Sequence, residues 1–303
     1  MDLLLLGGGG SGAAATASKT AGGGGAGEYV SKLAQSISAG SYSIVIGTGG
    51  AGVGVGTEGN AGGNTTGFGF TAKGGGKGSQ SGAGGTGGSG GGANAFSAVG
   101  GSSNAVDGVG FAGGGNGGGV YGGGGGGASA TGGSGAGGGS NGGAGLANSI
   151  TGASVTYSVG GGGANTADQA STYGSGSAGR DSASSTTAIS GVIIVRYLTA
   201  DSINSLCTGG TKTTDGAYTV HTFTSNGTFT FVSGIVTVST VAFTSTWQAI
   251  NLARGFNYIL TVTTASFIST WQAITLNVVQ NTIFLTPLIK TATTWINKVK
   301  PTP

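Results

Sequence analysis

The sequence predicts a stack of glycine helices of the polyproline-II type capped by β-strands, followed by an all-β hairpin and tandem β repeats, with essentially no α-helix. Three observations carry this prediction. All but six of the 74 glycines precede residue 198. Short stretches with period-two alternation of apolar and polar residues interrupt the glycine. A motif with a fixed 24-residue spacing recurs in the C-terminal third.

Composition excludes several classes of protein. The chain has 11 Lys and Arg, 8 Asp and Glu and 3 Pro, whereas disordered chains usually carry many charges and prolines. Collagen needs abundant proline within the glycine repeat, and the prolines here are all far from the glycine. One cysteine excludes a disulfide scaffold, and no window approaches the roughly 20 apolar residues of a membrane helix. The net charge of +3 is spread thinly and gives no indication of nucleic-acid binding.

The first residues predict a short buried strand. Met1–Leu6 has an acid where a signal peptide has basic residues, and its run of four leucines is shorter than the minimum of about seven for a signal sequence. We therefore expect no secretory signal. Further strands are expected where Tyr42, Ile44 and Ile46 alternate with serine and valine, at 155–159, and at 191–198, which reads as a strand buried on both faces.

The glycine runs can form an ordered structure by hydrogen bonding to one another. A polyproline-II helix has three residues per turn and no internal hydrogen bonds. Without Cβ atoms, such helices can approach closely enough to bond to one another. The expected interior runs are Gly74–Gly76, Gly113–Gly115, Gly122–Gly127, Gly137–Gly139 and Gly160–Gly163. A flexible linker is the alternative interpretation of the same composition.

The strands that flank the glycine carry a resemblance. Ser149-Ile-Thr-Gly-Ala-Ser-Val-Thr-Tyr157 and Val192-Ile-Ile-Val-Arg-Tyr197, with the opening Leu3–Leu6 before a glycine run, resemble the glycine-rich domain of bacteriophage tail-fibre and other virion-surface proteins over about residues 3–198. Residues 164–190 are mostly Ser, Thr and Ala and depart from that pattern. The resemblance implies a displayed structural domain at residues 1–198 and a location on the virion surface after synthesis in the host cytoplasm.

Residues 199–234 predict a β-hairpin connector between the two parts. Within 208–231, Tyr218, Val220 and Thr222 alternate with Thr219, His221 and Phe223, and Asn226-Gly227 is a strong two-residue turn signal.

Residues 235–303 predict tandem β repeats that serve for anchoring or oligomerisation. Ser245–Ile250 recurs as Ser269–Ile274, and a truncated third copy begins at Thr293. A fixed short period indicates units that bury their apolar faces against their neighbours. Stacking in a core is the preferred interpretation of the repeated tryptophans, with a carbohydrate platform as the alternative. The anchoring or oligomerisation candidates are Trp247, Trp271 and Trp295.

The residues for catalysis or for a cofactor are not evident, and we expect a protein that is not an enzyme. One His and one Cys exclude a multi-His/Cys metal site. His221 reads as an exposed or satisfied strand residue and Cys207 as an inert thiol. The carboxylates are isolated along the chain, and the glycine strings do not open helices, which a dinucleotide site requires.

Three functions remain open. The first is a virion component, as a tail fibre, head fibre or capsid decoration, for which we expect a homo-oligomer and for which a trimer is suited. In the second, the glycine-rich domain is an adhesin that contacts a host glycan or outer-membrane protein through Phe68, Phe70, Phe96, Phe111 and Tyr173. The third is an extracellular matrix or ice-binding protein of a cell, although the sequence does not display the threonine arrays that would favour it.

Overall fold

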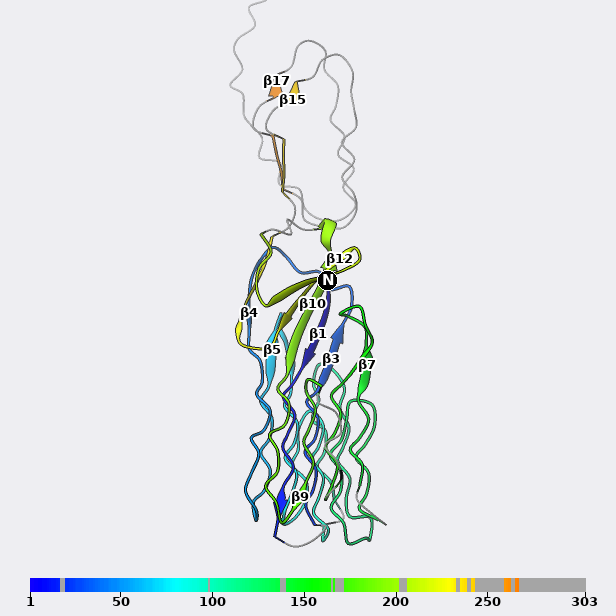
Figure 1. Cartoon of the computed structure of the whole chain (residues 1–303). Helices are drawn as coiled ribbons and strands as arrows, with labels where there is room; N and C mark the ends of the chain where they lie inside the picture. The colour runs from blue at the N-terminus through cyan, green and yellow to red at the C-terminus, as the bar shows by residue number, and fades with distance from the viewer. Residues whose placement is uncertain are drawn as a thin grey trace, which may run out of the picture. The chain divides into compact units, whose positions relative to one another are not determined.

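The computed structural model has two compact units, Met1–Gly234 and Ile235–Pro303 (Figure 1). It describes residues 1–16, 20–97, 99–136, 140–164, 166, 172–201, 206–232, 235–238, 241–242, 259–262 and 265–266. In these residues the regular structure is β, in small open sheets, apart from one 3-10 turn at Thr199–Asp201. The expected lack of α-helix is confirmed for this part of the chain.

A five-stranded antiparallel sheet is the centre of the first unit, in the order β11-β12-β10-β1-β3. Its strands are β1 (Asp2–Leu6), β3 (Tyr29–Lys32), β10 (Val192–Leu198), β11 (Thr211–Asp215) and β12 (Tyr218–Phe223). Every side chain of Leu3–Leu6 and Val192–Val195 is at most 1% exposed. A strand covered on both faces needs apolar residues at every position, so the predictions for residues 1–6 and 191–198 are confirmed.

A second layer covers one face of the central sheet. It contains β4 (Gly40–Ile44) paired with β13 (Gly227–Phe231), and the hairpin of β5 (Thr65–Gly67) and β6 (Phe70–Ala72). Phe229 and Phe231 are buried, and the Phe229 ring lies 5.1 Å from the His221 ring of β12. A side chain at Gly67 would strike the ends of Ile193 and Ile44. The two layers therefore enclose a packed core.

A short hairpin covers the opposite face of the central sheet. It pairs β7 (Leu146–Asn148) with β8 (Val155–Tyr157). Tyr157 and Ile150 share a buried apolar cluster with Leu4, Leu6 and Ile194. Alternation in β1 and β10 thus sends neighbouring side chains to the two faces, and both faces are covered.

The hairpin predicted within residues 208–231 forms, but its turn lies elsewhere. β11 and β12 pair antiparallel around Gly216, whose φ is +55°. β13 follows Asn226 yet pairs with β4, and the Asn226 side chain accepts a hydrogen bond from the Ile46 N–H at 2.8 Å. Both edges of β12 are already occupied by β10 and β11. Consequently Asn226-Gly227 leads the chain into the second layer, and residues 206–232 lie in the same compact unit as the glycine-rich part.

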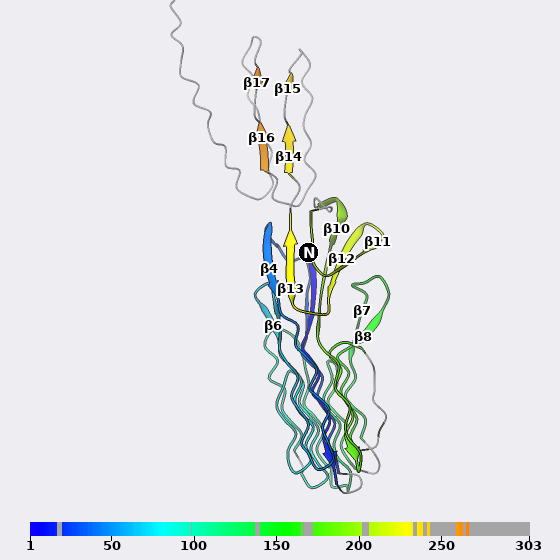
Figure 2. The ribbon, with the colours of Figure 1, turned by 60° about the vertical axis from the view of Figure 1, so that its left-hand side comes forward.

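The glycine-rich segments extend from the strands and lie side by side (Figures 1 and 2). Every third N–H of the first segment donates to one antiparallel neighbour, in the pairs Gly7–Glu28, Gly10–Gly25 and Ala13–Gly22 at 3.1, 2.8 and 3.0 Å. Between them, Gly8 donates to Gly63 and Gly9 to Ile189, at 3.0 and 2.9 Å. Successive residues of one segment thus bond to different neighbouring segments. Of the predicted interior runs, Gly137–Gly139 lies outside the described residues.

This bonding requires the absence of side chains. A Cβ atom added at Gly75 would lie well inside 3.0 Å of the Gly25 carbonyl oxygen and would also strike the Gly10 amide. Such contacts involve backbone, which cannot turn aside as a side chain can. The close approach of three main chains at this point therefore depends on glycine.

A buried carboxylate joins the glycine-rich segments to the start of β3. The Glu28 side chain is 0% exposed. One of its oxygens accepts the N–H groups of Val106, Asp107 and Gly108 at 2.9, 2.7 and 2.5 Å, and the other accepts the Lys73 N–H at 3.0 Å. Charge-assisted bonds from the main chain satisfy a buried carboxylate without a cation, and here they hold two loops against one strand.

In the second unit the structure describes four short strands. β14 (Ile235–Val238) pairs in parallel with β16 (Ile259–Val262), and β15 (Val241–Ala242) pairs in parallel with β17 (Ala265–Ser266). Each residue pairs with the one 24 positions later, as in Ile235 with Ile259 and Val241 with Ala265. The three tryptophans Trp247, Trp271 and Trp295 lie outside the described residues.

We predict that Gly75→Ala destabilises the first unit by about 3 kcal/mol, because overpacking against backbone cannot be relieved by a rotamer change. Thermal or denaturant unfolding of the full chain measures this change. Gly82→Ala is the matched control, since a Cβ atom there meets nothing within 4 Å, and it should alter stability by less than about 1 kcal/mol. Equal effects of the two substitutions would contradict the packing described here.

Candidate binding site

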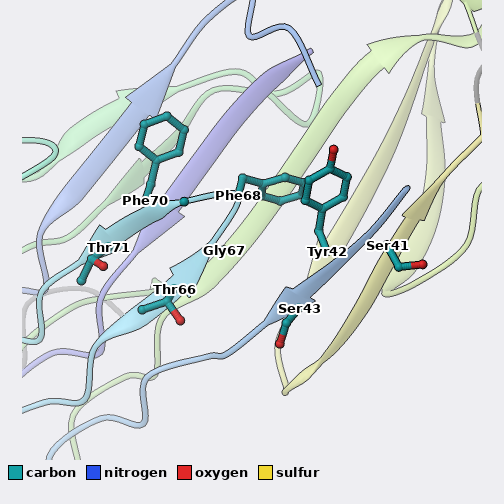
Figure 3. Close-up of a pocket in the computed structure, with 9 residues that line it drawn as sticks. Ser41, Tyr42, Ser43, Thr66, Gly67, Phe68, Phe70 and Thr71 are labelled. Atoms are coloured by element: carbon teal, nitrogen blue, oxygen red, sulfur yellow. The ribbon is translucent and has the colours of Figure 1, made fainter. Parts of the chain in front are cut away.

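An open groove lies where β4 and the β5–β6 hairpin diverge. The two segments are joined by a pair of hydrogen bonds between Val45 and Thr66, each 2.9 Å long. Beyond this pair the hairpin turns away at Phe68-Gly69, which leaves a groove of about 470 Å³ lined by residues 41–43 and 66–71 (Figure 3).

The hairpin turn holds Phe68 in a strained conformation. Phe68 and Gly69 have φ values of +57° and +83°, as a type I′ turn requires. A bulky residue at positive φ is uncommon, and such strain persists where surrounding contacts enforce it. Here the Phe68 ring packs 5.0 Å from the Tyr42 ring and 5.6 Å from that of Phe229, measured between centroids. The turn thus seals the end of the core and forms one wall of the groove.

The opposite wall is a strand edge. Thr230 exchanges main-chain hydrogen bonds with Thr208 at 3.0 Å, so its neighbours Phe229 and Phe231 direct their main-chain groups toward β4. Their partners in β4 are Tyr42 and Gly40. Because N–H and C=O groups alternate between the two edges of a strand, those of Ser41 and Ser43 point toward the β5–β6 hairpin, where a Cβ added at Gly67 would lie 3.7 Å from the Ser43 carbonyl oxygen. Among the described residues, pairing along this edge stops at Val45.

Hydroxyl groups form the outer rim of the groove. Figure 3 shows Tyr42 and Phe68 lying against each other, while Ser43, Thr66 and Thr71 point to the other side of their strands. Cross-strand pairing extends this hydroxyl surface to Thr228, opposite Ser43, and to Thr230, whose Oγ1 is 3.2 Å from the Ser41 Oγ. No charged side chain is among the residues that line the groove, so it suits an uncharged ligand.

A cation beside the groove is already engaged. Lys32 donates a hydrogen bond to the Asp107 carbonyl at 2.7 Å and lies 5.1 Å from the centre of the Phe70 ring. Phe70 is half-buried and is fixed in part by this ammonium group. Phe68 and Phe70, expected from the sequence to contact a receptor, are therefore brought to one groove.

The other predicted contact residues lie apart from the groove. Phe96 is 82% exposed in a loop, where Asn116 donates to the carbonyls of Ser97 and Ala95 at 2.9 and 2.8 Å. Val99 and Val120, in the same two loops, are also exposed. Phe111 and Tyr173 are half-exposed at other positions. Sequence reasoning missed Ser41, Tyr42 and Ser43 as groove residues, although their alternation marked a strand.

An aromatic cluster leads from the groove to the one histidine of the chain. The Phe229 ring lies between those of Phe68 and His221. His221 is fully buried, with Nδ1 2.7 Å from the Gly209 carbonyl oxygen and Nε2 3.0 Å from the Tyr197 hydroxyl. A carbonyl only accepts, so Nδ1 carries the proton and the neutral ring accepts at Nε2. His221 is therefore a buried core residue whose two ring nitrogens both have hydrogen-bond partners.

The two residues considered for chemistry, His221 and Cys207, are both buried in the described structure. No group of three or more His, Cys, Asp or Glu side chains that could hold a metal ion occurs among them. Cys207 is buried, with its sulfur 3.3 Å from the Val232 N–H. In the same part of the chain, no helix has the length and apolar character needed to cross a membrane.

Comparison with known proteins gives a partial match. Residues 1–122 are similar to a protein family described as a glycine-rich domain. No curated protein and no solved structure matches the chain. The family similarity covers the segments that build the groove and much of the glycine-rich bonding, and its description names the glycine-rich domain without reference to a virion.

We predict that Phe68→Gly lowers the free energy of unfolding by about 1 kcal/mol. Losing a half-buried ring should cost about 2 kcal/mol, and relieving the positive φ should return about 1 kcal/mol. Chemical denaturation measures the difference. Phe68→Ala loses the ring and keeps the strain, so it should be the less stable of the two variants; the reverse order would show that the turn is unstrained.

We predict that stability falls as the pH is lowered from about 7.5 to 5. Burial lowers the pKa of His221 below its ordinary value of 6.5, opposed by the hydrogen bond to Gly209 and aided by Lys212. The unfolded chain therefore takes up a proton near pH 6.5 before the folded chain does. The stability that neutral His221 contributes is complete above about pH 6.5. It is lost as the pH falls toward the lower pKa of the folded state, and the free energy of unfolding changes by at most about 1.4 kcal/mol per pH unit. Unfolding curves at several pH values measure it, and His221→Gln should remove the slope.

Proposed function

We propose that this chain is a non-catalytic structural protein of a bacteriophage virion, a surface appendage that displays its glycine-rich unit for attachment to the host. The tail fibre, head fibre and capsid decoration are the forms considered. The observation that carries the proposal is the bonding of glycine-rich main chains to several neighbours at once, which suits a displayed scaffold. The resemblance of residues 3–198 to phage glycine-rich domains supplies the particle context.

We infer that the glycine-rich segments are stacked helices of the polyproline-II type. Every third residue of the first segment, Gly7, Gly10 and Ala13, donates to the same neighbouring segment, and the residues between them donate to other segments. This is the three-residue period of that helix. The same period appears where Gly23 and Ala26 donate to Gly123 and Gly126 at 3.0 and 2.9 Å. This periodicity and the close backbone contacts support the inference.

We further propose that residues 235–303 are tandem 24-residue β units that anchor or oligomerise the protein. The 24-residue offset between paired strands equals the spacing of Trp247, Trp271 and Trp295 in the sequence. Units that stack on their neighbours expose an end, and another copy or another virion protein can cover it. A homotrimer is the proposed assembly, because symmetric β-repeat fibres favour closed rotational symmetry.

Host contact is proposed to occur at the groove and at the loop that carries Phe96. Both present aromatic side chains without clustered charge, which suits a neutral surface glycan or an outer-membrane protein loop. The small net charge of +3 gives no indication of nucleic-acid binding.

The proposal predicts that mass spectrometry of purified particles detects this chain and that antibody labelling locates it on the particle surface. Excess purified protein should reduce phage adsorption at least tenfold by occupying the receptor, and Phe96→Ala should weaken that competition. Leu33→Ala, at an exposed apolar residue that is not among the contact candidates, is the control. Detection in the envelope of uninfected cells and absence from particles would instead indicate a cellular matrix protein, and thermal hysteresis would indicate an ice-binding one.

A further inference from the structure

We propose that Asn141 is a site of spontaneous deamidation, which gives the folded glycine-rich unit a slow covalent modification. The inference goes beyond the proposed function, since it concerns the chemistry of the chain itself. In this reaction the main-chain nitrogen of Gly142 attacks the side-chain Cγ of Asn141. The side-chain NH2 takes up the proton of the attacking amide and leaves as ammonia. Solvent water then opens the five-membered succinimide ring, which gives aspartate or its β-linked isomer, isoaspartate.

The sequence offers three places for this reaction. Asn-Gly pairs occur at residues 116–117, 141–142 and 226–227. Glycine favours the reaction because it has no Cβ atom to hinder the attack of its nitrogen. Ring closure also requires the side-chain amide and the following main-chain nitrogen to be free to rotate toward each other. The hydrogen bonds that hold these two groups therefore decide which of the three asparagines reacts.

The first pair is held on both its side chain and its main chain. The Asn116 side chain donates to the Ala95 carbonyl at 2.8 Å and accepts the Gly118 N–H at 3.1 Å. The main chain of Asn116 donates to the Ser97 carbonyl and accepts the Gly119 N–H, both at 2.9 Å. Closure of a succinimide ring at this position would have to break several of these bonds together.

The third pair is held by the strands of the second layer. The Asn226 side chain accepts the Ile46 N–H at 2.8 Å. Gly227 begins β13 opposite Ile44 of β4. It lies two residues before Phe229, so its main-chain groups point toward β4 as those of Phe229 do. The nitrogen that would have to attack Asn226 is therefore engaged in strand pairing.

The middle pair is held least. The Asn141 side chain is exposed, and in the described part of the chain neither its amide nor the Gly142 N–H has a hydrogen-bond partner. The Asn141 carbonyl accepts the Gly133 N–H at 2.8 Å. Ring closure here has only this main-chain bond to break among the described residues, so we assign the reaction to Asn141.

The two products should affect the structure differently. Gly143 donates to Gly125 at 2.8 Å and accepts the Gly160 N–H at 2.9 Å, so the residues beside Asn141 are fixed to neighbouring segments. Aspartate keeps the main chain unchanged and adds one negative charge at an exposed position. Isoaspartate carries the main chain through the side-chain carbon and lengthens it by one atom. The bonds to Gly133 and Gly125 then lose their common register, and we expect only isoaspartate to loosen this part of the unit.

The test incubates the folded full-length protein at mildly alkaline pH and follows each Asn-Gly pair by peptide mapping with mass spectrometry. We expect Asn141 to lose its amide roughly tenfold faster than Asn116 or Asn226, because more hydrogen bonds must open at the other two sites. In denaturant the three rates should converge. Asn141→Gln should remove the fast loss, because glutamine forms the corresponding six-membered ring much more slowly.

The structural consequence has its own control. Asn141→Asp introduces the same charge without lengthening the main chain, and it should unfold at the temperature of the parent protein. The aged fraction that contains isoaspartate, identified by enzymatic methylation, should unfold at a lower temperature. Equal destabilisation of the two would show that charge causes the effect and would overturn this part of the inference.

Other results would overturn the site itself. Equal rates at the three pairs in the folded protein, or a faster loss at Asn116 or Asn226, would do so. Retention of the Asn141 amide in the folded protein, when the denatured chain loses it, would show that the surrounding segments protect it. Detection of the chain in phage particles tests the proposed function separately, because neither result determines the other.

Discussion

Main chains of separate segments can bond directly to one another only where no side chain holds them apart, and the first unit depends on this constraint. Glycine loses more conformational freedom on folding than any other residue. That loss is offset here because close approach lets successive amides of one segment bond to several neighbours, as Gly8, Gly9 and Gly10 do. Each bond contributes only about 0.5–1.5 kcal/mol, so stability requires many of them together, and a single Cβ in the interior disturbs more than one.

The strands bury apolar side chains, which glycine lacks. A glycine scaffold buries little apolar surface, while β1 and β10 bury leucine, isoleucine and valine on both faces of one sheet and gain hydrophobic stabilisation there. Glu28 links the two kinds of structure, since its carboxylate collects main-chain donors from two loops at the point where the glycine-rich segment becomes β3. The apolar layers thereby fix the ends of segments whose middles are held by amide bonds.

The groove arises because Phe68 has two structural roles. It lies in the tight turn of the β5–β6 hairpin, and its aromatic ring covers the end of the core. Phe68 meets both by accepting a positive φ, and its ring covers Phe229 while the hairpin leaves the edge of β4. The groove beside Ser41 and Ser43 is therefore a consequence of how the core is closed. Its surroundings are uncharged and rich in hydroxyl groups.

The sequence by itself predicted strands at residues 1–6, 41–46, 155–159 and 191–198, because unbroken or alternating apolar patterns indicate which faces are buried. The corresponding strands lie at Asp2–Leu6, Gly40–Ile44, Val155–Tyr157 and Val192–Leu198. It also indicated where glycine concentrates and that Phe68 and Phe70 belong to one local segment. Tertiary structure decided which edges were free. Asn226-Gly227 has the chemistry of a hairpin turn, yet β12 was already paired on both sides, so β13 joined β4. The groove needs β4 beside β5, and the hydroxyl rim needs β13 as well, segments separated by up to about 190 residues. Local patterns specify which side of a strand is apolar, whereas long-range pairing decides which strands lie along its two edges.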